Sequence, residues 1–225
     1  MPSTKAAPST APTGSSRVRL DPDTILEAVL TLTARPGVTS LNVRELGREL
    51  GCDPTAIYRH FRGKDDLLNA ALDRLHTQVL SRITADPEDW RQRLLQLVNA
   101  TLDLFAAHPA IGMEAINTTT DGPGERAAVE FVLDALTRAG LDEAEVVRFY
   151  AVLSQYAMSS AAGLARSVAH GRSDDSSWFE SAGTSSPEDH PRLAALGPQL
   201  RSLTEREPVS FGLDLILDAV ERAAN

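Results

Sequence analysis

Residues 41–68 read LNVRELGRELGCDPTAIYRHFRGKDDLL, and the order of helix-starting and helix-ending signals in this stretch decides the fold. Asn42 is followed three residues later by Glu45, which is the spacing of a capping box at the start of a helix. A helix is therefore expected over 43–50. Gly51 is placed to end it, since glycine adopts the left-handed conformation that closes many helices.

A second helix follows almost at once. Asp53-Pro54 marks its start, because an Asp side chain accepts hydrogen bonds from the free amides of a first turn and Pro fits the first helical position. This helix is expected over 54–60, and the short turn before it makes the two helices cross steeply, as in a helix-turn-helix. Gly47 lies where the second helix would approach the first; the alternative is a surface position, where glycine costs about 1 kcal/mol relative to alanine.

The second helix has one apolar edge and one edge rich in hydrogen-bonding groups. The apolar side chains of this region can form one small core: Ile25, Leu26, Val29, Leu32, Leu46, Leu50, Ile57 and Phe61. The polar edge must then face outward, with Thr55, Tyr58, Arg59 and His60. Such an edge suits the DNA major groove, because Arg can bind a guanine edge bidentately while Tyr and His bind phosphates. The alternative is a solvated helix with an incidental aromatic residue.

Similar signals occur along the rest of the chain. Asp-Pro pairs recur at 21–22 and 86–87, and Asp142 with Glu145 repeats the capping-box spacing. Apolar residues follow helical spacing nearly throughout, without a convincing alternating run that would indicate a strand. An all-α fold is therefore expected, with further helices at about 22–35, 64–84, 87–107, 125–139, 143–170, 190–203 and 209–223 and a less regular segment at 109–118.

The chain divides into three parts. Residues 1–16 are Pro, Ser, Thr and Ala with few exceptions, and we expect a disordered tail because they can bury little apolar surface. Residues 17–64 form the helix-turn-helix domain, and residues 65–225 form a larger helical body. The net charge of −9 is uneven, since residues 1–64 carry nine Lys and Arg against six Asp and Glu, and the remainder carries thirteen against twenty-five. This asymmetry indicates two different tasks.

Composition excludes several classes of protein. The single cysteine, Cys52, excludes an internal disulfide and a cysteine-rich zinc site. No apolar run approaches the roughly 20 residues needed to span a bilayer, and the first sixteen residues lack the apolar core of a signal peptide. We therefore expect a cytoplasmic protein without membrane association.

From Leu20 to Leu75 the chain resembles the TetR family of transcriptional regulators. The matching features are the Arg-x-Leu of the first helix, the Leu-Gly turn, Tyr-x-His-Phe, and Gly-Lys followed by Leu-Leu. The resemblance implies an all-α fold in which an N-terminal three-helix helix-turn-helix domain binds DNA and a larger helical domain binds ligand and dimerises. The endings DHPRLAAL and FGLDLILDAVERA are similar to the tetracycline-repressor-like C-terminal branch.

The resemblance also implies roles for single residues. Thr55, Ala56 and Arg59 would face base edges. Tyr58, His60 and Lys64 would hold phosphates, and Arg44 would reach a base or the backbone. Arg44 could instead only balance helix charge, and Lys64 could simply be solvated.

The resemblance implies a homodimer as well. The helices at 143–170 and 209–223 would meet their copies in a four-helix interface. The first contains AMSSAAGLA, a run of small residues that permits close approach, and the second has only a narrow polar stripe. The alternative is that both helices pack only within one chain.

A stripe on the helix at 87–107 suggests a ligand pocket. It contains Trp90, Leu94, Val98, Thr101, Phe105 and His108. The two polar members, Thr101 and His108, would orient a bound molecule on an otherwise apolar wall. Further soft or aromatic candidates are Met113, Phe131, Phe149, Tyr156 and Trp178. The alternative for each candidate is a core position, or for His108 a helix-end position. The stretch with which the tetracycline repressor holds magnesium has no recognisable match, so a magnesium–tetracycline complex is not expected as the ligand. No cofactor is expected.

Together these features favour a homodimeric repressor that a small apolar ligand releases from a palindromic operator. An alternative is a helix-turn-helix regulator controlled by a protein partner. An enzyme is not expected, because the five histidines form no HExxH or other metal-ligand spacing and the chain has no GxSxG and no phosphate-binding glycine loop.

Overall fold

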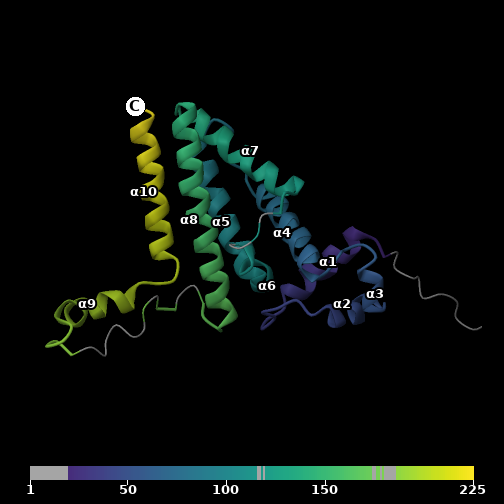
Figure 1. Cartoon of the computed structure of the whole chain (residues 1–225). Coiled ribbons are helices and arrows are strands. Elements are labelled where there is room, and N and C mark those ends of the chain that lie inside the picture. Colours follow the sequence, from purple (N-terminus) through teal and green to yellow (C-terminus); the bar gives the residue numbers. More distant parts are fainter. Residues whose placement is uncertain (1–19, 116–117, 119, 174–175, 178, 180–185) are drawn as a thin grey trace, which may run out of the picture.

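The computed structural model describes residues 20–115, 118, 120–173, 176–177, 179 and 186–225. The expected tail at 1–16 and Trp178 therefore lie outside the described residues. Within these residues the chain forms helices and no strand, which confirms the all-α fold (Figure 1). The helices are α1 (Pro22–Thr33), α2 (Val43–Leu50), α3 (Pro54–Ile57), α4 (Lys64–Ser81), α5 (Trp90–Ala107), α6 (Pro109–Gly112), α7 (Pro123–Arg138), α8 (Glu143–Ala169), α9 (Pro191–Ser202) and α10 (Glu207–Ala223).

Most of the helix starts follow from the sequence. Four predicted caps accept a backbone N–H at 2.8–3.0 Å: Asp21, Asn42, Asp53 and Asp142. The start predicted from Asp86-Pro87 is wrong. Asp86 accepts from Glu88 N (2.8 Å) in a separate turn, and Asp89 caps α5 by accepting from Gln92 N (3.0 Å). The second acidic residue competes for the same role and moves the start to Trp90.

Two helices end three residues earlier than expected, and the less regular segment at 109–118 is α-helical only at its start. α3 was expected to reach 60 but ends at Ile57, and the chain continues in tighter turns in which Ala56 O accepts from Arg59 N (3.3 Å) and Ile57 O accepts from His60 N (3.0 Å). α4 ends at Ser81 instead of about 84, and α6 covers only the first four residues of the segment expected over 109–118.

The molecule has a small three-helix front and a larger helical body, and α4 leads from one into the other (Figure 1). α5 and α8 pack along each other at the centre of the body, and α4 contacts α1, α5 and α7. None of the helices in the described part of the chain is long and apolar enough to cross a bilayer.

The predicted core of the front is confirmed with one exception. Seven of the eight side chains are buried, and Leu50 at the end of α2 is only half-buried. Leu67 and Leu68 of α4 belong to the same continuous apolar core, which extends into the body. The start of α4 is therefore packed into the core of the front, where α1 contacts it.

Candidate nucleic-acid interface and ligand cavity

Two glycines bring α2 and α3 close together. Gly51 has a φ of 64°, in the left-handed region that glycine adopts without strain, and Cys52 N donates to Gly47 O (2.9 Å). A Cβ at Gly47 would lie 3.0 Å from Cys52 O and 3.3 Å from the Pro54 ring. The close approach that we predicted at Gly47 is therefore confirmed.

The side chains of α3 and of the turn after it are buried or exposed as the sequence predicts. Ile57 is fully buried and Phe61 is 6% exposed, while Tyr58 is 44% exposed. Thr55, Arg59 and His60 are exposed as well, and Ala56 is half-buried. The structure thus brings five of the seven predicted DNA-binding residues together on α3 and the turn that follows it.

The hydroxyl of Thr55 has a fixed direction. It donates to Asp53 Oδ1 at 2.6 Å, and the Thr55 amide donates to the same oxygen at 2.8 Å. These two hydrogen bonds lower the pKa of Asp53 below its ordinary value and keep it ionised. Because its proton is engaged, the Thr55 hydroxyl can only accept from a further partner, such as the amino group of a base.

Three cations flank this edge. Arg44 lies at the start of α2, Arg59 after α3, and Lys64 at the first position of α4, and all three are exposed. Within the described residues none of them forms an ion pair. The N-cap of α4 is Gly63, which has no side chain to satisfy the first amides of this 18-residue helix. The start of α4 therefore presents both a cation and free amides to an anion.

His108 connects the body to the front. Its Nδ1 lies 3.0 Å from Thr33 Oγ1 of α1, and both residues are buried. Burial lowers the pKa of His108, and the charge of nearby Arg82 lowers it further. A second link is the ion pair between Arg74 of α4 and Asp23 of α1.

The body encloses a cavity of about 270 Å³ between α4, α5, α7 and α8. Most of its wall is apolar, and residues from all four helices contribute to it, among them His76, Thr101, Glu125, Leu153 and Met158. Among the predicted ligand-binding residues that the structure describes, Thr101 alone lines this wall, and its hydroxyl donates to Leu97 O (2.8 Å).

The other described candidates lie elsewhere. Phe105 is fully buried behind the cavity wall, with its ring edge-on to His76 at a centroid distance of 6.2 Å. Phe131 packs under the guanidinium of Arg93, which lies 4.3 Å from the ring centroid. Met113 and Phe149 are partly buried against the main core. None of these four side chains, nor His108, is among those that line the cavity.

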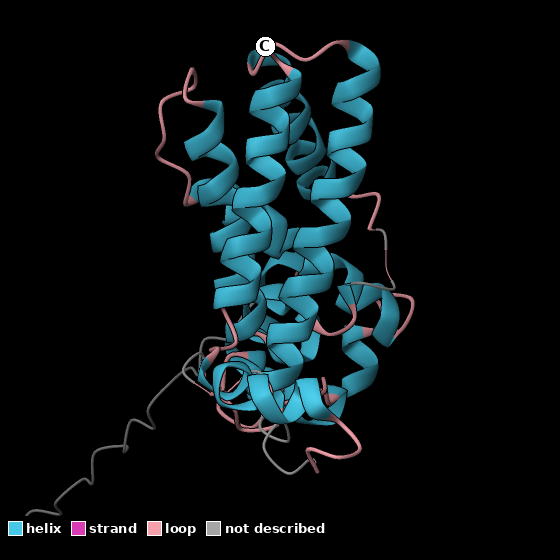
Figure 2. Cartoon of the chain, turned by 90° about the vertical axis from the view of Figure 1, so that its left-hand side faces the viewer, coloured by secondary structure: helices cyan, strands magenta, loops and turns pink. Residues whose placement is uncertain are grey.

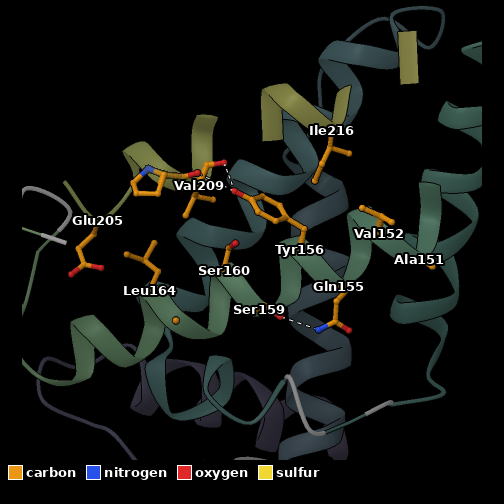
Figure 3. Close-up of a pocket in the computed structure, with 12 residues that line it drawn as sticks. Ala151, Val152, Gln155, Tyr156, Ser159, Ser160, Leu164, Glu205, Val209 and Ile216 are labelled. Atoms are coloured by element: carbon orange, nitrogen blue, oxygen red, sulfur yellow. Dashed lines mark hydrogen bonds between the residues drawn. The ribbon is translucent and has the colours of Figure 1, made fainter. Parts of the chain in front are cut away.

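Tyr156 lies in a groove of about 900 Å³ between α8 and α10, which we call the α8–α10 groove. Its ring projects from α8 toward the first turn of α10, and its hydroxyl donates to Val209 O at 2.8 Å (Figure 3). A Cβ at Gly212 would lie 2.3 Å from the Tyr156 hydroxyl oxygen, so that glycine is needed where the ring meets α10. Burial raises the pKa of Tyr156.

The outer side of α10 is apolar. Phe211 is 67% exposed and Leu215 is 51% exposed. The helix α10 itself lies on the side of the molecule that faces the viewer in Figure 2. The polar stripe of the helix turns instead toward Arg91 of α5, whose Nη2 lies 2.7 Å from Asp218 Oδ1 and 3.7 Å from Asp214 Oδ1.

The neighbouring face of α8 continues this apolar surface. Val147 and Val152 are each more than half exposed. Mostly small residues at four-residue spacing form a row beside them: Ala151, Gln155, Ser159 and Gly163. No heavy atom lies within 4 Å of a Cβ built at Gly163, so the surface over this row is open. We call these exposed residues of α8 and α10 the α8–α10 face.

Comparison with known proteins identifies the family. Residues 25–71 match the bacterial regulatory proteins of the tetR family, and residues 84–223 match the tetracyclin repressor-like C-terminal domain, which is more than half of the chain. The chain belongs to the TetR family. Its helix-turn-helix is therefore the DNA-binding part of a bacterial transcriptional regulator.

Individual members of the TetR family are similar along much of the chain. An HTH-type transcriptional regulator of Saccharopolyspora erythraea is 32% identical over 141 residues, which are 63% of this chain and 59% of that protein. The chain thus matches less than two thirds of that relative's length. The class A tetracycline repressor of transposon 1721 from Escherichia coli is 28% identical over 211 residues, covering 91% of this chain and 92% of the repressor.

Solved structures agree in fold. ActR of Streptomyces coelicolor, in complex with (S)-DNPA, superposes with a TM-score of 0.75 at 21% identity over 92% of this chain and all of ActR. A putative transcriptional regulator of the same organism has a TM-score of 0.77 at 26% identity, again over 92% of this chain and all of the other. A further ActR structure contains actinorhodin.

Sequence reasoning missed the imidazole and the carboxylate of the described cavity wall, which belong to His76 and Glu125. His76 was tested only for metal-ligand spacing. Glu125 follows a Gly-Pro-Gly loop that carries no chemical signature. The available signal was the spacing of His76 about one turn from Leu72 and from Val79, which places it on the buried side of α4, where its ring meets Phe105 of α5.

Proposed function

We propose that this chain is a homodimeric repressor that binds a palindromic operator and leaves it when a small, largely apolar molecule binds in the body. The observation that carries the proposal is the exposed edge of Tyr58, Arg59 and His60, which is backed by buried Ile57 and lies beside the free start of α4. A helix end that contacts only water does not explain why an exposed aromatic side chain lies beside unpaired cations, whereas a DNA-binding surface does. We assign the protein to the cytoplasm on the same ground, since its partner would be chromosomal DNA.

The proposal divides the DNA contacts into two groups. Thr55, Ala56 and Arg59 would meet base edges, because they lie on the outer side of α3 and the turn after it. Tyr58, His60, Lys64 and Arg44 flank them and would hold phosphates, with Arg44 also in reach of a base. The DNA-binding domain would comprise residues 17–64 and the ligand-binding and dimerisation domain residues 65–225, with 1–16 as a disordered tail.

The homodimer is supported by the α8–α10 face. Large exposed apolar side chains on two adjacent helices are unusual for a monomer, and a contiguous patch of this kind marks an interaction surface. A second copy would cover the face in an isologous interface, in which the same patch of each chain meets the other. Two recognition helices related by such a two-fold axis would contact inverted half-sites on DNA.

Ligand response is supported by the path of α4. The helix begins at Lys64, at the proposed DNA surface, and its later turns carry His76 and Val79 into the cavity wall. A molecule in the cavity would therefore press on the helix that positions α2 and α3. A hundredfold loss of operator affinity requires about 2.7 kcal/mol of coupling, which is within the usual allosteric range. ActR, which shares the fold, holds a small molecule in each of two solved structures.

Two substitutions test the division of the DNA contacts. Arg59→Ala should cost about 1–3 kcal/mol per half-site and relax base preference there. Lys64→Ala should weaken binding to all sequences alike and lower the slope of log affinity against log salt by roughly one per contact. Binding of both variants to operator and to scrambled DNA would be measured over a range of salt concentrations. A change of base preference in Lys64→Ala without one in Arg59→Ala would reverse the assignment.

A compound screen tests ligand response against its alternative. Apolar metabolites and antibiotics would be added singly to the protein–operator complex, with release followed by fluorescence anisotropy. At least one compound should release the operator and raise the melting temperature of the DNA-free protein. If none does, control by a protein partner becomes the better account of the body.

A further inference from the structure

Two carboxylates meet beside the cavity, where α4 and α7 pack against each other. Asp73 of α4 accepts from the backbone amides of Gly124 (3.1 Å) and Glu125 (2.8 Å), so that it caps the start of α7 from another helix. Glu125 Oε2 accepts from Thr120 N (2.6 Å), Thr120 Oγ1 (2.7 Å) and Asp121 N (2.9 Å). Both carboxylates are therefore fixed in place by neutral donors.

Within the described residues no Lys or Arg pairs with either carboxylate. The two arginines adjacent to them in sequence are engaged elsewhere: Arg74 pairs with Asp23, and Arg126 donates to the carbonyl of Asp121. The amides at the start of α7, which Asp73 accepts from, act as roughly half a positive charge, and this offsets only part of two negative charges. This end of the cavity is therefore electronegative.

Glu125 contributes directly to the cavity wall, and one of its oxygens is unused. All three of its hydrogen bonds go to Oε2, and in the described part of the chain Oε1 has no hydrogen-bond partner. An ionised carboxylate can accept at both oxygens. Oε1 is thus an acceptor without a donor at the boundary of a mainly apolar space.

His76 contributes an imidazole to the wall. Its ring makes an edge-on contact with Phe105 but no hydrogen bond to another described residue. Burial lowers its pKa, although the carboxylates of Glu125 and Asp73 act in the opposite direction. A neutral imidazole offers one donor and one acceptor and adds no positive charge to the cavity.

We infer that the cavity takes a small lipophilic ammonium ion, with Glu125 as the counter-charge, His76 as a hydrogen-bond acceptor and the apolar wall around the hydrocarbon part. An anion of the same shape meets an electronegative surface with no cation to receive it, so it is excluded. This inference rests on the proposed function, in that the cavity is the effector site, and it adds the charge of the effector.

Three matched probes test the inference on the unmodified protein. They are 1-naphthylmethylamine, 1-naphthylmethanol and 1-naphthoate, which at neutral pH are a cation, a neutral molecule and an anion on the same ring system. Their affinities would be measured by isothermal titration calorimetry. The amine should bind at least about tenfold more tightly than the alcohol, and the alcohol more tightly than the carboxylate. Equal affinities, a preference for the carboxylate, or no binding of any probe would overturn the inference.

Two variants locate the charge that matters. Glu125→Gln keeps a carbonyl oxygen for Thr120 and Asp121 but removes the negative charge, so the preference for the amine over the alcohol should fall to about one. Glu130→Gln removes an equal charge from an exposed position on the same helix and should leave the preference unchanged. If Glu125→Gln retains the full preference, Glu125 is not the counter-charge and the inference fails.

The failure of this inference can be distinguished from the failure of the proposed function. If the compound screen finds an effector that is an anion, the sensor stands and only the charge assignment is wrong. If no compound of any charge releases the operator, the sensor itself is wrong. A loss of stability in Glu125→Gln would leave the charge preference itself testable, because the probe series on the unmodified protein measures that preference without any variant.

Discussion

The hydrogen bond between Thr33 and His108 gives a direct test of how the front is held on the body. Thr33 is fully buried and His108 is 8% exposed, and Thr33 Oγ1 lies 3.0 Å from the ring Nδ1. Thr33→Val keeps the size and branching of the side chain but removes the hydroxyl that meets the buried ring nitrogen and also donates to Leu30 O (3.3 Å). An unsatisfied buried polar group costs about 1–3 kcal/mol. For a chain of this size the melting temperature should fall by about 2–12 °C.

The matched control is Thr31→Val on the same helix. Thr31 is exposed and its hydroxyl donates only to Glu27 O (2.8 Å), so its loss should change stability by less than about 0.5 kcal/mol. Both variants would be melted at the same protein concentration and followed by circular dichroism. Melting temperatures that agree within a degree would refute the claim that this bond stabilises the contact between α1 and the end of α5.

Two further predictions concern the buried groups of the body. Burial lowers the pKa of His76 and His108, so the unfolded chain binds protons more readily than the folded chain. The contribution of these two histidines to stability is fully present above about pH 6.5, and the melting temperature should fall as the pH drops below that value. A melting temperature that rises as the pH drops would contradict this sign. Gly124→Ala would place a Cβ 2.2 Å from the backbone oxygen of Asp73 and should lower the free energy of unfolding by about 1–3 kcal/mol, because α7 must move away from α4. The control is Gly63→Ala, whose new Cβ would meet no atom within 4 Å. Equal melting temperatures for the two variants would contradict the close packing of α7 on α4.

Local signals in the sequence were enough to predict the front of the molecule. Each of these signals depends on residues within about one helical turn of each other. The structure confirms the caps at Asn42 and Asp53, the helix end at Gly51 and the burial of Ile57. The shorter α3 could not be predicted, because Tyr58 is compatible both with an α-helix and with the tighter turns that replace it.

The cavity could not be predicted from one helix. The stripe on α5 correctly marks its buried face, yet of its two polar members only Thr101 reaches the cavity. His108 lies at the end of α5, where the backbone leaves the helical conformation (φ −127°) and the ring meets Thr33 of α1. Which side chains line a space between four helices depends on how the helices pack, and periodicity within one helix does not contain that information.

The central claim, that this TetR-family chain is a homodimer that binds an inverted repeat, is tested most directly by sequencing the genomic DNA that the purified protein retains. The account predicts that the enriched fragments share one inverted repeat, with half-sites centred about one helical turn apart or a multiple of it. It also predicts that the retained complex contains an even number of protein chains by multi-angle light scattering. Enriched fragments without a common inverted repeat, or a single chain bound at full affinity to one unrepeated site, would contradict the account.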